Sequence, residues 1–344
     1  MENKQPSAEL SWKDLEPMFR PKGVHMGVMQ CDVELCTQCG LCIENCPFKA
    51  WEAGENDVPH LKQDYACFSC YNCMVACPTG AISIGKPYEV EKGNFYETAD
   101  GPLPAKMPLE PQDADGQPDA WTEMERHIFE RRSVRNFKSK PVPDHMIRRV
   151  LEAGRFAPSA GNCQPWKFIV LTDPQLIAAI NGAVHQVLKM LYSAYMDDDA
   201  VKSLVQRYAQ DPKPGSYDPR VIIGGIGSVA KGEISAFLDA PALILVACDE
   251  RSIGTPEMHA GICGQNMNLA AKALGLGFCW IGWSKIIEMV PEIKSKLGLQ
   301  YPWKIFTGAV LGYPKFKQEG MVPREFRPVT WFRPGENGPV IESA

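Results

Sequence analysis

The chain has 344 residues, 45% of them hydrophobic, and a formal net charge of −5. This length predicts two or three domains. An acidic chain without a long basic run gives no support for nucleic-acid binding, and the longest apolar stretch, at 240–248, is too short to cross a bilayer. The first residues carry no apolar signal core, so we expect a cytoplasmic protein with no membrane span.

Two runs of cysteines near the start of the chain share one spacing. The second run repeats the first 31 positions later, and each ends in Cys-Pro: Cys36, Cys39, Cys42 and Cys46, then Cys67, Cys70, Cys73 and Cys77. The C-x2-C-x2-C-x3-C-P spacing is typical of bacterial [4Fe-4S] sites. Zinc also binds C-x2-C pairs, but rarely three evenly spaced cysteines with a trailing Cys-Pro in tandem. We therefore expect two [4Fe-4S] clusters and one-electron transfer.

Residues 28–85 resemble bacterial two-cluster ferredoxins, with short strands expected at 28–31, 58–61 and 81–84. In such ferredoxins the fourth ligand of each cluster comes from the other run. The resemblance therefore assigns Cys36, Cys39, Cys42 and Cys77 to one cluster, and Cys67, Cys70, Cys73 and Cys46 to the other. Cys31 lies outside both runs and is expected to be a small buried strand residue rather than a ligand.

A proline-rich segment at 86–119 follows the ferredoxin domain. Its six prolines and few periodic apolar positions predict an extended strap on the surface of the next domain. A fully disordered linker is the alternative. The expected organisation is thus an N-terminal arm (1–27), a ferredoxin domain (28–85), a linker (86–119) and a second domain (120–344).

The second domain combines helical and strand patterns without a strict β-α-β rhythm. Helices are expected at 121–131, from Asp144 to just before Pro158, and at 174–196, 256–274 and 286–297. Strands are expected at 167–171, 242–248, 278–281 and 304–311. This mixture predicts an α+β fold.

Three patches of this domain carry candidate chemistry. The first gathers guanidinium groups and a hydroxyl suited to a phosphate monoester, although a basic helix end is more often a solvated face: Arg131, Arg132, Ser133 and Arg135. The second, 157–166, is a polar turn that can present an amide and a hydroxyl to a planar ligand, or is an ordinary helix-to-strand turn. The third, 261–283, holds glycines that let backbone approach a ring, although core packing explains most of it.

Together and in this order, the three patches resemble the nitroreductase family of FMN-dependent oxidoreductases, over about 121–328. The resemblance implies FMN contacts at Arg131, Arg132, Ser133 and Arg135 (phosphate), Ser159, Asn162 and Gln164 (ring and ribityl chain), the backbone of Ile281, Gly282 and Trp283 (beside the reactive nitrogen), and Arg324 or Arg327 (phosphate). Many members have an acidic residue where Gly282 stands, so the catalytic group is left open. The resemblance also implies a homodimer with FMN at the interface, and the tail after Pro328 would wrap the partner.

The segment 183–239 is longer than a compact member of that family needs. Loop-rich insertions often cover active sites, so we expect a substrate lid near Tyr192, Tyr195 and Tyr208, or else ordinary helix-face tyrosines. The remaining cysteines lack metal spacing and are expected to be small buried hydrophobes: Cys163, Cys248, Cys263 and Cys279. Cys163 lies in the predicted flavin loop and is the one to test.

The predicted function is a fused electron chain in an anaerobic setting. A low-potential donor such as ferredoxin or flavodoxin would reduce the clusters, the clusters would reduce FMN, and the flavin would reduce a small organic acceptor such as a nitroaromatic, a quinone or an activated alkene. Two alternatives stay open. NAD(P)H could reduce FMN directly while the clusters export electrons, or the protein could be a non-catalytic electron carrier or redox sensor.

Overall fold

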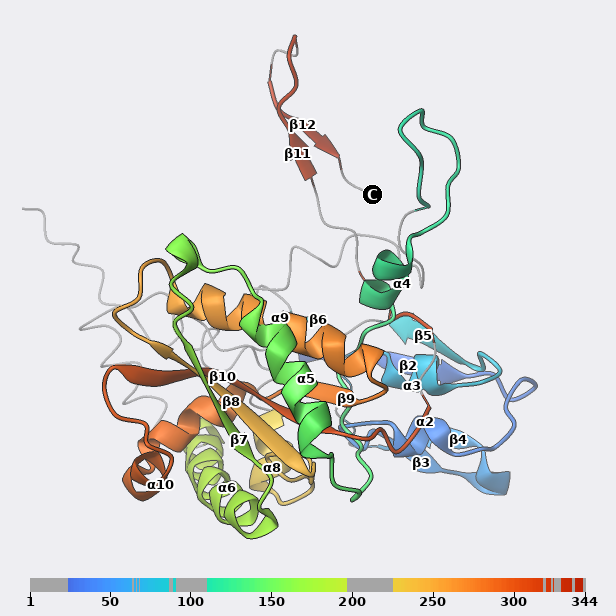
Figure 1. Ribbon diagram of the computed structural model, residues 1–344. Helices are drawn as coiled ribbons and strands as arrows, with labels where there is room; N and C mark the ends of the chain where they lie inside the picture. Colours follow the sequence, from blue (N-terminus) through green and yellow to red (C-terminus); the bar gives the residue numbers. More distant parts are fainter. Residues whose placement is uncertain are drawn as a thin grey trace, which may run out of the picture. The chain divides into compact units, whose positions relative to one another are not determined.

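The chain is described from a computed structural model, and the residues described are 24–63, 65, 67, 69–86, 89–90, 110–196, 225–317, 320–322, 324, 329–335 and 338–342. The chain divides into two compact units, and Figure 1 shows its helices and strands coloured along the sequence. The first unit comprises 1–118, 193–225 and 321–344, and the second comprises 119–192 and 226–320. In the described residues, no helix has the length and apolar character needed to cross a membrane.

Short antiparallel strand pairs build the first unit. The pairs are β2 (Val28–Cys31) with β5 (Ile82–Lys86), β3 (Trp51–Ala53) with β4 (Pro59–Leu61), β1 (Val24–His25) with β6 (Glu89–Val90), and β11 (Val329–Trp331) with β12 (Val340–Glu342). The strand patterns predict β2, β4 and β5. They miss β3, because three residues show no usable alternation and this strand exists through its pairing with β4.

The sequence repeat of the cysteine runs is also a structural repeat. Helices α2 (Leu41–Glu44) and α3 (Asn72–Ala76) begin at equivalent positions of the two runs. Left-handed backbone recurs at the same spacing, in the pairs Gln38 and Ser69, Gly40 and Tyr71, and Lys49 and Gly80. Glycine adopts this conformation readily and other residues do so at a cost. Its presence at Tyr71 and Lys49 therefore indicates that the geometry of the cysteine loops sets the backbone there.

A small core that includes cysteines holds the first unit together. Trp51, Tyr71 and Ile82 are buried in it, and Cys42, Cys46 and Cys73 belong to the same cluster of packed side chains. An apolar core of this size stabilises a small domain only weakly, and such domains commonly rely on metal groups or disulfides as well. The cysteines therefore occupy positions where bound groups would add to the stability of the unit.

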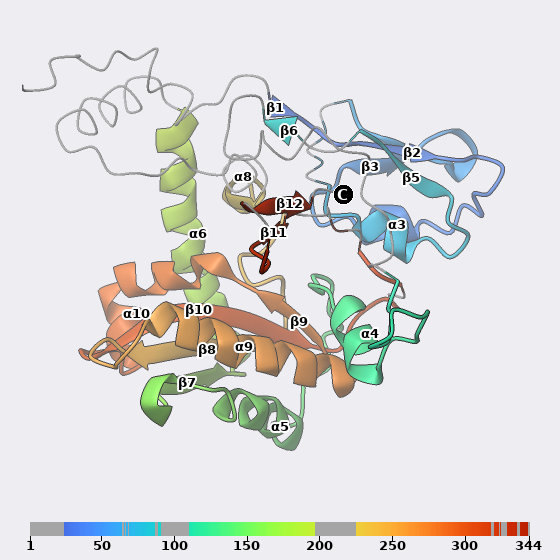
Figure 2. The same cartoon turned by 90° about the horizontal axis from the view of Figure 1, so that it is seen from above.

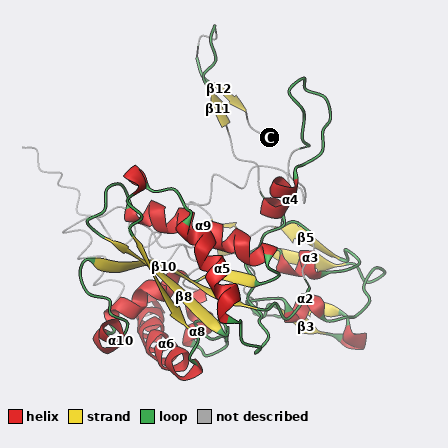
Figure 3. Cartoon of the chain, in the orientation of Figure 1, coloured by secondary structure: helices red, strands yellow, loops and turns green. Residues whose placement is uncertain are grey.

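The second unit is organised around a four-stranded antiparallel sheet of order β7-β8-β10-β9. Its strands are β7 (Trp166–Leu171), β8 (Ala242–Asp249), β9 (Gly277–Trp280) and β10 (Trp303–Gly312). Strand β8 is central and buried up to its last residue, which explains its nearly continuous apolar sequence. Helices and strands are interleaved here (Figure 3), and the predicted α+β class is confirmed.

Helices cover both faces of this sheet. Helices α5 (Asp144–Arg155) and α9 (Pro256–Ala273) pack on one face, against alternate side chains of β8 such as Ile244 and Val246. Helix α6 (Pro174–Met196) lies on the other side of the sheet (Figure 2). It buries Ile180, Val184 and Leu188 completely, at the four-residue spacing of one helix face. The shorter helices are α4 (Glu123–Phe129) and α8 (Gly227–Ala230).

The single helix predicted at 286–297 is wrong. A 3-10 segment, η5 (Gly282–Met289), ends there and α10 (Pro291–Lys296) begins separately. Val290 between them is extended, with φ −111° and ψ 93°. A residue that precedes proline is disfavoured in the helical region, so Pro291 breaks the pattern that the apolar spacing suggested.

The predicted strap and lid lie mostly outside the described residues. Of the strap at 86–119, the structure describes 86, 89–90 and 110–119, where Gln112 and Pro118 form a bridge that closes a turn around Asp113. Of the insertion at 183–239, it describes 183–196 and 225–239. Both expectations therefore stay predictions.

Candidate functional site

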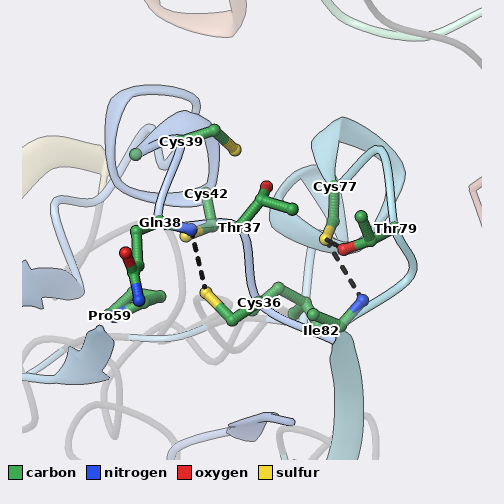
Figure 4. A pocket seen from close by; sticks show the side chains of 11 residues that line it. Cys36, Thr37, Gln38, Cys39, Cys42, Pro59, Cys77, Thr79 and Ile82 are labelled. Carbon is green, nitrogen blue, oxygen red and sulfur yellow. Dashed lines mark hydrogen bonds between the residues drawn. The ribbon is translucent and has the colours of Figure 1, made fainter. Parts of the chain in front are cut away.

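Four cysteines taken from both runs line one cavity of the first unit. Figure 4 shows Cys36, Cys39 and Cys42 on one side of it and Cys77 on the other. Helix α2 carries Cys42, and Cys77 directly follows α3. This is the crossed set that the ferredoxin resemblance assigned to the first cluster.

The other four cysteines also lie close to one another. The pKa of Cys73 is raised by burial and by the negative charge of three nearby thiolates, those of Cys70, Cys46 and Cys67. The pKa of Cys67 is raised in the same way, by burial and by Cys70 and Cys46. Burial is the main reason that the pKa of Cys73 lies well above its ordinary value and that of Cys67 rises to about 12. A positive metal centre offsets this cost, because it stabilises the thiolates directly. The second crossed set is therefore also suited to a metal group.

Backbone amides donate to the two Cys-Pro sulfur atoms in the same way. Ala50 N donates to Cys46 Sγ and Ala81 N to Cys77 Sγ, each at 3.2 Å. Burial acts to raise the pKa of Cys77, but hydrogen bonds from Thr79 and from backbone amides outweigh it, and the pKa is lowered. Such N–H···S bonds stabilise thiolate charge and tune the potential of an iron–sulfur cluster.

The four cysteines of the first crossed set line one cavity. Within the described part of the chain, no three Cys, His, Asp or Glu side chains come close enough to hold a single metal ion. A cluster fills the space between its thiolates. The cavity and its amide donors thus fit a [4Fe-4S] group, held by the first crossed set.

Cys31 lies beside this first set. It is half-buried at the end of β2, and burial, followed by its hydrogen bond with Cys36, raises its pKa to about 12. The charges of the Cys42 and Cys77 thiolates also raise the pKa of Cys31. The residue is therefore less enclosed than expected and faces the ligands of the first crossed set.

The phosphate motif of the second unit lies beside β9, and its side chains alternate between buried (132 and 134) and half-buried (131, 133 and 135), as in extended chain. Val134 N donates to the Phe278 carbonyl at 3.0 Å, and successive side chains of extended chain point to opposite sides. Burial raises the pKa of the Cys279 thiol, whereas Arg135, the hydroxyl of Ser133 and Arg131 lower it. Arg131, Ser133 and Arg135 therefore share one side of the segment, where two guanidinium groups and a hydroxyl suit a phosphate.

Arg132 points to the other side. It is buried, it donates to the Gly320 carbonyl, and burial lowers its pKa to about 10. It lines a cleft of about 400 Å³ together with lysines and aromatic rings: Lys138, Lys272, Lys315, Lys317, Phe278, Tyr313 and Phe316. The structure thus separates Arg132 from the three phosphate-motif residues with which the sequence grouped it.

The loop at 159–164, which we call the flavin loop, connects α5 to β7. Ser159 Oγ accepts from Gln164 N at 3.0 Å, which closes the loop on itself. Residues 161–164 are exposed, including Asn162, Cys163 and Gln164. Cys163 is therefore not the buried residue we expected, whereas Cys248, Cys263 and Cys279 are buried as predicted. The loop presents polar side chains to whatever lies against it.

In the third patch, 261–283, the predicted FMN contacts are backbone groups at 281–283. Ile281 N donates to the Gly308 carbonyl at 2.8 Å, which ties the end of β9 to β10. The Trp283 indole donates to the Ala236 carbonyl at 2.7 Å. A side chain at Gly282 would meet nothing within 4 Å. The chain is thus open at Gly282, as a flat ligand beside this backbone requires.

Other predicted residues are less informative. Arg324 is exposed and belongs to the first unit, and Arg327 lies outside the described residues. Lys231 Nζ lies 5.9 Å from the ring centre of Tyr192, whereas the side chain of Tyr195 and all of Tyr208 lie outside the description. His259, a fully buried side chain that accepts a hydrogen bond from the flavin loop, carries no signal in the sequence.

Comparison with known proteins identifies both parts. Residues 128–313 match the nitroreductase family, and residues 35–82 match the 4Fe-4S dicluster domain. The chain belongs to the nitroreductase family, and it is an oxidoreductase with an iron–sulfur domain at its N-terminal side.

Individual relatives are each similar to a portion of the chain. Chloronitrobenzene nitroreductase of Comamonas testosteroni is 28% identical over 205 residues, which cover 54% of this chain and 84% of that protein. NADH dehydrogenase of Thermus thermophilus is 44% identical over 55 residues, 16% of this chain and 27% of that protein. A solved nitroreductase from Desulfitobacterium hafniense with bound FMN is 22% identical and aligns with a TM-score of 0.44, over 60% of this chain and 96% of that one.

The residues present fit FMN. Arg131, Ser133 and Arg135 supply a donor set for a phosphate on one side of one segment. The open backbone at Gly282 leaves room for a ring. Exposed amide groups at Asn162 and Gln164 supply donors and acceptors for a polar ring edge.

Proposed function

We propose that the protein is a reductase in which two [4Fe-4S] clusters feed FMN, and that a small organic acceptor receives the electrons. The crossed grouping of the cysteines carries the proposal, since cysteines from both runs line one cavity. When bound, the clusters supply one-electron transfer and FMN supplies two-electron chemistry. Fusing both to one chain raises the effective concentration of donor and acceptor.

The chain's own residues would bind and orient these groups. We propose that the crossed cysteine sets hold the clusters, with the amides of Ala50 and Ala81 donating to thiolate sulfur. Arg131, Ser133 and Arg135 would neutralise the FMN phosphate, with Arg324 or Arg327 as a further partner. The backbone at 281–283 would lie beside the reactive nitrogen, where amide dipoles stabilise developing charge. The acceptor would be a nitroaromatic, a quinone or an activated alkene.

Anaerobic stopped-flow tests the direction of electron flow. We expect reduced ferredoxin or flavodoxin to bleach the flavin absorbance quickly, and an added nitroaromatic or quinone to reoxidise it. Fast bleaching by NADH or NADPH, with none by reduced ferredoxin, would contradict the inward direction. If no organic acceptor reoxidises the protein faster than buffer does, the enzymatic role is wrong.

One observation favours the reverse direction as a second candidate. A segment of 55 residues is similar to a protein named NADH dehydrogenase. In this candidate, NAD(P)H reduces FMN directly and the clusters export electrons. The same stopped-flow experiment separates the two, because only here does the nicotinamide reduce the flavin first.

We also propose a homodimer and a reducing, cytoplasmic compartment. The family is often dimeric, which supports the homodimer. None of the thirteen cysteines, all of which the structure describes, forms a disulfide, as is usual in reducing compartments. Light scattering during gel filtration tests the dimer, and a mass of one chain would contradict it.

A further inference from the structure

The flavin loop has a strained backbone. Gly161, Asn162 and Gln164 have positive φ angles of 54°, 54° and 46°. Asparagine tolerates this conformation better than most residues, but at Gln164 it is costly, and such a residue persists only where the surroundings hold it. The bonds within the loop close it but do not anchor it to the fold, because they join Ser159 to Asn162 and Gln164, and Ala160 to Cys163. An anchor from outside the loop is therefore required.

Two side-chain hydrogen bonds reach outside the loop. Cys163 Sγ donates to the Ile253 carbonyl at 3.9 Å on the exposed side, and the shorter, more buried bond is made with α9. Ala160 N donates to His259 Nε2 at 3.1 Å, across 99 residues of sequence. His259 is fully buried near the start of the helix. A side chain added at Gly254 would lie 3.1 Å from Ala160 Cβ and 3.2 Å from His259 Cε1. The loop, the turn at Gly254 and the imidazole are thus packed together with no spare room.

This hydrogen bond determines which nitrogen of the neutral His259 imidazole carries the proton. Because Nε2 accepts, the neutral ring carries its proton on Nδ1. Nδ1 is buried and makes no hydrogen bond to the residues that the structure describes. An apolar side chain would fill this place without burying a polar nitrogen. A histidine at position 259 is therefore explained by the hydrogen bond that its Nε2 accepts from the Ala160 amide.

We propose that His259 is a positioning residue for FMN. Its Nε2 holds the Ala160 amide and so keeps the flavin loop in the strained form that presents Ser159, Asn162 and Gln164. The inference rests on the proposed function, in which this loop contacts FMN. It adds a buried residue from another element, which touches neither FMN nor the acceptor.

Two readouts on the full-length, cofactor-loaded protein test the proposal. The first is hydrogen–deuterium exchange of the segment 157–166, and the second is the dissociation constant of FMN. His259→Leu removes the acceptor and should speed exchange and weaken FMN binding, each by about 10-fold. His259→Gln keeps an acceptor oxygen near the position of Nε2 and should restore most of both. Cys263→Ala, one turn along the same buried face of α9, is the matched control and should leave both unchanged.

The outcomes separate the anchor from the proposed flavin contact. Unchanged exchange in His259→Leu, no rescue by Gln, or equal acceleration in Cys263→Ala would overturn the anchor. Faster exchange with FMN affinity within about 2-fold of the original would overturn the positioning role and show that the loop does not contact FMN. Failure of the unaltered protein to bind FMN would instead overturn the proposed function. Thermal unfolding of each variant checks that the fold is retained.

Discussion

The two units of this protein use cysteine in opposite ways. In the first, cysteines gather in two groups of four on tight loops, and amides of Ala50 and Ala81 donate to sulfur. In the second, Cys248 and Cys263 are enclosed by the apolar core, where burial raises the pKa of each to about 12. Burial alone therefore does not distinguish ligands from packing residues. Close spacing and aligned amide donors do.

The units also differ in how their sequences relate to their shapes. The first unit repeats a short loop twice, so local spacing describes most of it. The second depends on a sheet whose neighbouring strands lie far apart in sequence, as β7 and β8 do. Substitutions in the first unit should thus act on single clusters, and those in the second should act on long-range packing.

The largest expected effect tests the crossed grouping. Cys36→Ser with Cys77→Ser removes two ligands of one proposed cluster, so iron and sulfide should fall by about half. Cys36→Ser with Cys46→Ser removes a ligand from each cluster, so both should be lost. Metal analysis and electron paramagnetic resonance measure this, and FMN absorbance should persist in both double variants.

The control for this pair is Cys31→Ser, which should keep both clusters. If the Cys36/Cys77 variant loses all iron while the Cys36/Cys46 variant keeps half, each run holds its own cluster and the crossed grouping is wrong.

The next effect concerns the two sides of the phosphate motif. Arg135→Gln should weaken FMN binding by about 10- to 100-fold, because a charged hydrogen bond to phosphate is lost. Arg132→Gln should change the affinity by less than about 3-fold, since its side chain lines the separate cleft. Fluorescence titration with FMN measures both. Equal losses in the two variants would show that Arg132 also reaches the phosphate.

A smaller effect is expected in the packing of α9 against β9. A side chain at Gly264 would collide with the Trp280 indole, so Gly264→Ala should lower the free energy of unfolding by about 1–3 kcal/mol. Gly261 lies in the same helix with nothing within 4 Å of an added Cβ. Gly261→Ala should therefore raise stability by about 0.5–1 kcal/mol. Denaturant unfolding compares them, and a loss in both would point to helix strain and away from the indole.

The smallest effect contrasts the cysteines of the second unit. Cys163 is exposed, whereas burial raises the pKa of Cys248 and Cys263 to about 12. A raised pKa keeps a thiol uncharged as the pH passes its ordinary value of about 8.5, and only the thiolate reacts well. Iodoacetamide at neutral to mildly alkaline pH should therefore label Cys163 and spare the other two. Peptide mass spectrometry detects this, with Cys163→Ser as control, and rapid labelling of Cys248 in the folded protein would refute it.

Local patterns in the sequence determined much of this protein. The spacing of eight cysteines over 42 positions, from Cys36 to Cys77, predicted the dicluster domain, which comparison confirms. Apolar periodicity located β8 and α9, and the order of three motifs indicated the nitroreductase family. These features are readable because covalent spacing and periodicity act over a few residues.

Only the tertiary structure decided which of these residues face one another. Grouping Arg132 with Arg131 and Arg135 was natural in sequence, but an extended segment beside β9 sends alternate side chains to opposite sides. The bond between His259 and Ala160 joins residues 99 positions apart, and no local pattern marks it. Such pairs depend on how helices and strands pack, so they follow from the whole fold and not from spacing along the chain.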